Sequence, residues 1–95
     1  MDQQMLARAW RQRGFSCRLW VDPPGQVWEN FRHTVDELVM VIDGDLEVET
    51  EQTLLRPRPG EEVLIPAGVR HSVRNCGGTA AHWLFGYKEL NSSET

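Results

Sequence analysis

Ninety-five residues suffice for one domain but not for two, because a hydrophobic core built from fewer than about 50 residues is hard to stabilise. The composition, with 40% hydrophobic and 25% charged residues, indicates a folded globular protein and argues against a disordered or fibrous one. A formal net charge of -4 lacks the basic surface that phosphate backbones require, so we expect no nucleic-acid partner.

The N-terminal part of the chain predicts a short amphipathic helix over residues 3 to 13, where apolar residues recur at spacings of three to five between Arg and Gln. The opening MDQQM lacks the charged and apolar regions of a secretion signal. No apolar run approaches the roughly 20 residues of a membrane span. We therefore expect no membrane partner and a cytoplasmic location.

After the helix, the pattern changes to short alternating or apolar segments separated by turn residues, which predicts an all-β domain. The turns are marked by DPPG, DGD, RPRPG and NCGG. We expect strands at residues 15–21, 26–34, 37–42, 45–51, 53–56, 61–65, 70–75 and 79–88. Eight strands of this length are enough for a closed or double-sheet barrel.

The segment ELVMVI, residues 37–42, is apolar on both faces after its first residue, so both faces must be covered. One cover would be the second sheet, and the other would be either the N-terminal helix or a second chain. This pattern leads us to expect a homodimer. The expected organisation is a helical extension, a barrel domain and a flexible tail, at residues 1–14, 15–88 and 89–95.

Two histidines fall on the apolar faces of predicted strands. In NFRHTV, His33 alternates in step with Phe31 and Val35, and in RHSVR His71 shares a face with Val73. A buried imidazole without a hydrogen-bond partner costs on the order of 1 to 3 kcal/mol. A lone inward histidine usually meets a carbonyl or hydroxyl group, but a barrel interior would bring two of them together.

The carboxylate of Glu37 lies four positions beyond His33 and could join the two imidazoles. Two imidazoles and one carboxylate suit a divalent metal and leave positions open for water or substrate. Periodicity does not fix the direction of Glu37, because this residue follows a break in the strand. The alternative is that His33 and His71 form hydrogen bonds within a purely structural barrel.

Two stretches resemble the sequence motifs of the cupin superfamily. HTVDELVMVIDG has the first-motif spacing of His, Glu and Gly, at His33, Glu37 and Gly44. GEEVLIPAGVRHSVRN matches the second motif at every defining position, namely Gly60, Pro66, Gly68, His71 and Asn75. The resemblance covers about residues 15–88 and implies a double-stranded β-helix, or jelly-roll, barrel that is usually dimeric.

The resemblance also implies a metal site of two first-motif histidines, the glutamate and the second-motif histidine. His33, Glu37 and His71 match this pattern, whereas Phe31 occupies the position of the first histidine. The implied cofactor is a divalent ion (Fe, Mn, Ni or Zn). The implied substrate is a small oxygen-bearing molecule, in a dioxygenase-, isomerase- or epimerase-like reaction. The alternative is a non-catalytic small-molecule-binding or sensory protein that has lost the metal.

Four residues are candidates for the ligand pocket. Phe31 places a ring where an imidazole would have pointed, and Trp28 is one of several aromatics expected to line the core and pocket. Glu29 shares the parity of Phe31 and either reaches the pocket or lies at its rim, paired with an arginine. His82, in AAHWLFGYK, has no readable direction; facing inward, it would replace the missing fourth ligand.

Overall fold

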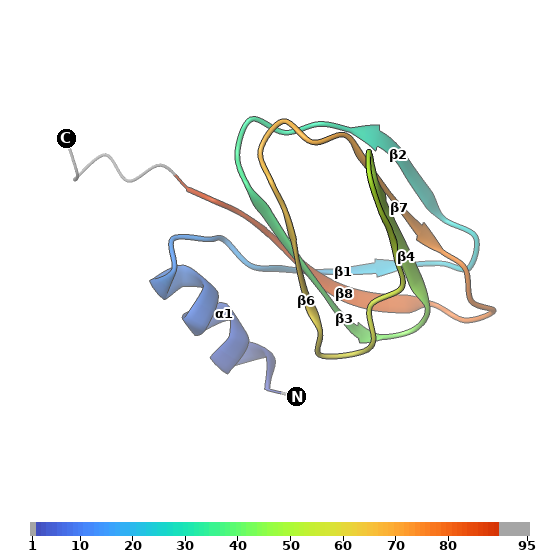
Figure 1. Cartoon of the computed structure of the whole chain (residues 1–95). Coiled ribbons are helices and arrows are strands. Elements are labelled where there is room, and N and C mark those ends of the chain that lie inside the picture. The colour runs from blue at the N-terminus through green and yellow to red at the C-terminus, as the bar shows by residue number, and fades with distance from the viewer. Residues whose placement is uncertain (1, 90–95) are drawn as a thin grey trace.

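The computed structural model describes residues 2–89 as one helix and eight strands (Figure 1). The helix is α1 (Gln3–Gln12), and the strands are β1 (Arg18–Asp22), β2 (Val27–Phe31), β3 (Glu37–Asp43), β4 (Leu46–Thr50), β5 (Leu54–Leu55), β6 (Glu62–Ile65), β7 (His71–Asn75) and β8 (Ala81–Tyr87). Each of the eight expected segments overlaps one observed strand. The all-β jelly roll with a short N-terminal helix is confirmed. The expected tail falls, except for its first residue, outside the described residues.

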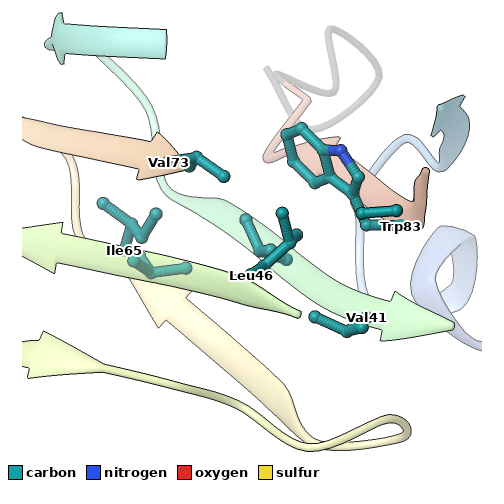
Figure 2. Close-up of a cluster of buried hydrophobic side chains, with 8 residues drawn as sticks. Val41, Leu46, Ile65, Val73 and Trp83 are labelled. Atoms are coloured by element: carbon teal, nitrogen blue, oxygen red, sulfur yellow. The ribbon is translucent and has the colours of Figure 1, made fainter. Parts of the chain in front are cut away.

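The strands form two antiparallel four-stranded sheets, in the orders β1-β8-β3-β6 and β2-β7-β4-β5. Except for β4 and β5, neighbouring strands in each sheet come from distant parts of the chain. The inner faces meet in an apolar cluster (Figure 2) made of Val39, Val41, Leu46, Val48, Ile65, Val73, Ala81 and Trp83. This cluster is the core of the barrel.

The second apolar face of β3 is covered by the N-terminal helix (Figure 1). The helix is capped by the Asp2 carboxylate, which accepts hydrogen bonds from two backbone N–H groups of the first turn. Its Trp10 is only 1% exposed and packs with Leu38, Met40 and Leu84. This face therefore needs no second chain, and the homodimer loses the sequence argument on which it was predicted.

Three motif residues have structural roles: two glycines adopt positive φ in turns, and one asparagine binds backbone carbonyl groups. Gly44, in the β3–β4 turn, has φ +103, and a Cβ there would lie 2.7 Å from the Cα of Ala81. Gly68 has φ +81, in the loop before β7. The Asn75 side-chain amide donates to three carbonyl oxygens, at 3.2, 3.1 and 2.9 Å, from Asp22, Pro23 and Thr79. These contacts fasten the ends of β1 and β8 to β7.

Within residues 2–89, no helix has the length and apolar character needed to cross a bilayer.

Candidate metal centre

The side chains of His33, Glu37 and His71 converge inside the barrel. Glu37 Oε1 lies 3.1 Å from His71 Nε2 and 3.5 Å from His33 Nε2. One candidate ligand atom from each residue lies within 4.8 Å of the other two. The side chains of Glu37 and His71 are 6% and 3% exposed, and that of His33 is 26% exposed. Glu37 and His71 are therefore buried, and the cluster is accessible beside His33.

The three residues come from both sheets, and backbone contacts hold them in place. Glu37 begins the central strand β3, whereas His71 begins β7 of the other sheet and His33 lies in the loop between β2 and β3. The N–H of Gly68 donates to the carbonyl of His33 at 2.8 Å, and the N–H of Ala67 donates to an Asp36 carboxylate oxygen at 2.8 Å. The loop preceding His71 is thus tied to the loop carrying His33.

The hydrogen bond of the His71 ring fixes its tautomer. His71 Nδ1 lies 3.0 Å from the carbonyl oxygen of Val69. A carbonyl oxygen only accepts, so Nδ1 must carry the proton, and Nε2 of the neutral ring presents a lone pair. That lone pair faces Glu37 Oε1, which is buried and accepts no hydrogen bond from any described residue. Two acceptors therefore face each other across 3.1 Å.

This arrangement requires a positive charge between the two acceptors, supplied by a proton or by a metal ion. Burial alone lowers the pKa of His71, but the Glu37 carboxylate and the Val69 carbonyl outweigh it and raise that pKa above its usual 6.5. The imidazolium form of His71 therefore persists to higher pH in the metal-free site than in the unfolded chain. A metal ion would compete with this proton.

The raised pKa of His71 gives the metal-free protein a definite pH dependence. Its stabilising contribution is fully present below the unfolded value of 6.5 and is lost as the pH rises through the higher folded pKa. Urea unfolding of EDTA-treated protein between about pH 5.5 and pH 8.5 should therefore show wild type losing stability relative to His71→Gln. A difference between the two proteins that does not change with pH would contradict this assignment. Metal affinity should show the opposite trend and increase with pH, because protons compete for the ligands.

A cavity of about 230 Å³ opens beside the three residues. Its lining combines the two histidines and the glutamate with seven apolar or aromatic side chains: Trp20, Trp28, Phe31, Val73, Trp83, Phe85 and Tyr87. A mainly apolar pocket with a few converging polar groups is the usual form of a small-molecule site. The arrangement can hold a small ligand against the polar cluster.

Phe31 lies beside both imidazoles. Its ring centroid is 6.1 Å from that of His33, in a stacked arrangement, and 6.4 Å from that of His71. The ring is partly exposed and lines the cavity. Phe31 stands where the motif would carry a further histidine ligand, and it contributes an apolar side chain to the cavity wall.

Two candidate pocket residues point elsewhere, and both expectations are corrected. The β2–β7 register shifts between Trp28 and Phe31, where Asn30 has φ 61, so strict alternation fails. Trp28 and Phe31 both line the cavity, while Glu29 lies at the rim with its carboxylate 3.8 Å from Arg74. This is the alternative that the sequence left open for Glu29.

The other corrected residue is His82. Its Nδ1 lies 2.7 Å from an Asp43 carboxylate oxygen, and its side chain is 41% exposed. The register of β3 against β8 shifts between Val41 and Asp43, which brings these two side chains together at the surface. His82 therefore cannot serve as a fourth ligand.

Sequence reasoning missed the buried carboxylate of Asp22, which it treated only as the start of the DPPG turn. Asp22 is 1% exposed and accepts hydrogen bonds from three indole N–H groups. The donors are Trp20 at 2.8 Å, Trp28 at 3.1 Å and Trp83 at 3.0 Å. The one available signal was the shared parity of Trp20 and Asp22 on β1, which gives no hint of Trp83.

Comparison with known families agrees with the fold. The family model described as Cupin domain matches residues 18–87 of the chain. Protein SchB of Streptomyces halstedii is 33% identical over 72 residues, which make up 76% of this chain and 52% of SchB. The chain thus spans about half the length of that curated relative.

Solved structures give the same architecture. The cupin domain of an XRE family transcriptional regulator from Enterobacter cloacae superposes with a TM-score of 0.72 at 22% identity, covering 86% of this chain and 90% of that one. An oxalate oxidase superposes with a TM-score of 0.69 at 27% identity, covering 81% of this chain and 43% of that one. The first likeness shows the fold alone.

Proposed function

The chain belongs to the cupin domain family, and from this premise we propose that it binds one divalent metal ion through His33, Glu37 and His71 and acts on a small oxygen-bearing molecule. The observation that carries the proposal is the buried Glu37 Oε1, which lies 3.1 Å from His71 Nε2 and accepts no hydrogen bond while that nitrogen carries a lone pair. A metal ion would satisfy both atoms at once.

Two of the separations between donor atoms match those expected around one ion. Ligand atoms bound at about 2.1 Å to the same ion lie roughly 3.0 to 3.5 Å apart. The separations from Glu37 Oε1 to the two imidazole nitrogens, 3.1 and 3.5 Å, fall in this interval. Two nitrogens and one oxygen suit Fe, Mn, Ni or Zn and leave further positions open.

The residues around the cluster define what a ligand would meet. A bound ion would supply Lewis-acid chemistry or, as iron, dioxygen chemistry. The lining beside the cluster is mainly aromatic. Burial and the charge of Glu37 raise the pKa of Tyr87, so its phenol stays protonated. Its ring packs edge-on against His33, with centroids 4.8 Å apart, which places a hydroxyl-bearing residue in the cavity lining.

A second candidate function is a non-catalytic ligand-binding or sensory module. Phe31 favours it, because the ring replaces one of the four ligands that the motif pattern implies. The likeness to the cupin domain of a transcriptional regulator is compatible with it. The two candidates differ in whether the purified protein retains a metal.

A homodimer remains a proposal. It is supported by the exposed apolar side chains of Leu19 and Val21 on the edge strand β1, which a second chain would cover. A sedimentation mass of 10.9 kDa, that of one chain, would contradict it. The cytoplasmic location stays an expectation from the sequence.

Elemental analysis of untagged protein tests the metal proposal. Wild type incubated with each of the four candidate ions and then dialysed should retain about one ion per chain of at least one metal. His33→Ala and His71→Ala should lose it, because each removes a nitrogen ligand. His82→Ala is the matched control, since it removes a surface imidazole and should keep the metal. A wild type that none of the four ions loads, or a His82→Ala variant that also loses its metal, would overturn the proposal.

A further inference from the structure

The cavity wall is organised by one buried carboxylate outside the metal cluster. Asp22 accepts the N–H groups of all three tryptophans that line the cavity, Trp20, Trp28 and Trp83. The rings also contact one another and Phe85 edge-on or tilted, with centroids 5.5 to 6.2 Å apart. One charged group thus holds three large rings in fixed orientations.

These hydrogen bonds determine which groups the three tryptophan rings can offer to a ligand. Each indole has a single N–H donor, and all three are already used by Asp22. The rings therefore offer carbon faces and edges to a ligand and no hydrogen bond. Among residues 2–89, no lysine or arginine lines the cavity. Apart from the hydroxyl of Tyr87, whose ring packs against His33, the wall away from the metal cluster offers only apolar surface.

We propose that the ligand of this cavity is a small planar aromatic compound that carries a hydroxyl or carboxylate oxygen. Its ring lies against the tryptophan wall, and its oxygen reaches the His33, Glu37 and His71 cluster. The predicted contact of the ligand's oxygen rests on the proposed metal function. The predicted contact of its ring rests only on the tryptophan wall. Asp22 is a positioning residue, because it acts on the ligand through the indoles.

Other ligand classes fit the wall less well. A sugar-like molecule would bury several hydroxyl groups against carbon surfaces and leave them without partners. An organic cation would share a small cavity with a divalent ion, which repels it. An aromatic ring gains stacking or edge contacts with the indoles and leaves no polar group unpaired.

Salicylate and glycolate provide a matched pair of probes. Both carry a carboxylate with a neighbouring hydroxyl group, and only salicylate has an aromatic ring. Calorimetric titration of zinc-loaded protein should give a dissociation constant for salicylate at least about tenfold below that for glycolate. Equal affinities would overturn the inference while leaving the metal proposal intact.

Variants at the tryptophan wall distinguish a role in positioning the rings from a role in folding alone. Trp20→Ala removes a partly exposed ring and should bring the ratio of salicylate affinity to glycolate affinity close to one. Trp20→Phe keeps a ring at this position and should keep most of the preference for salicylate. Asp22→Asn should lower the same ratio without changing the zinc content, because a loosened wall affects only the ring. Leu64→Ala, at an exposed position outside the cavity lining, is the control and should match wild type. An Asp22→Asn protein with an unchanged ratio would refute the positioning role.

The same titration separates failure of this inference from failure of the metal proposal. Should wild type retain no metal, the ring preference is measured on metal-free protein, where the wall is unchanged. Salicylate binding more tightly than glycolate there would support the aromatic wall on its own. Equal or undetectable binding of both probes to metal-free and zinc-treated protein would overturn it.

Discussion

Replacing Trp10 by alanine should destabilise the protein by about 3 to 5 kcal/mol, the cost of removing a large buried aromatic side chain. Trp10 is 1% exposed, and its ring fills the space between α1 and the outer face of the β3 sheet. Its indole N–H donates to Glu62 Oε1 at 3.0 Å, so the substitution also removes a hydrogen bond that joins the helix to β6. Urea unfolding followed by tryptophan fluorescence would measure the loss.

The matched control lies on the same helix. Met5 is 64% exposed, so Met5→Ala should change the free energy of unfolding by less than about 0.5 kcal/mol. Equal, small effects of the two substitutions would show that the helix does not contribute to the stability of the sheet. The covered face of β3 would then need another partner, and a second chain would again be required.

Glu37→Gln should remove most of the metal-dependent stabilisation while leaving the metal-free protein as stable as wild type or more so. The substitution keeps the side-chain shape and removes the charged ligand oxygen. Its amide N–H can donate to the lone pair of His71 Nε2, which faces an acceptor in the wild type. Metal affinity should fall by at least about 100-fold, since even outer contacts to metal ligands are worth 10- to 100-fold.

Unfolding with and without zinc separates the two effects. At a zinc concentration of about 100 times the wild-type dissociation constant, wild type should gain about 2.7 kcal/mol and Glu37→Gln only about 0.4 kcal/mol. The metal-free comparison belongs at a pH well above the pKa of His71, where the imidazole is neutral. A variant that gains as much from zinc as wild type would exclude Glu37 as a ligand.

The sequence predicted the strands well because turn residues and alternation are local signals. The segment that contains β7 alternates cleanly, so the inward direction of His71 could be inferred. The two-sided apolar pattern of β3 correctly indicated a cover on each face, and the helix provides one of them. Which of two possible covers is used depends on long-range packing, which a local pattern does not encode.

The two candidates that do not line the pocket have a physical explanation. Counting Glu29 with the pocket residues assumed strict alternation along β2, but the register shift at Asn30 breaks it. A similar shift in β3 accompanies the surface pairing of His82 with Asp43. Bulges arise from strand pairing across the sheet, so a single sequence gives little warning of them.

Asp22 was missed for a different reason. Its three donors come from β1, β2 and β8, and only the folded barrel brings them to one carboxylate. In the sequence, the aspartate stands before two prolines, where a turn is the ordinary interpretation. Clusters of this kind depend on topology and cannot be found from spacing alone.

The central claim is that His33, Glu37 and His71 hold one ion together. Anomalous diffraction tests it most directly, on crystals of the protein grown with whichever of the four candidate ions it retains and with data collected on both sides of that metal's absorption edge. The account predicts a single strong anomalous peak within about 2.0 to 2.3 Å of His33 Nε2, Glu37 Oε1 and His71 Nε2. A map with no peak at this junction, or with the metal bound only at surface residues such as His82 and Asp43, would contradict it.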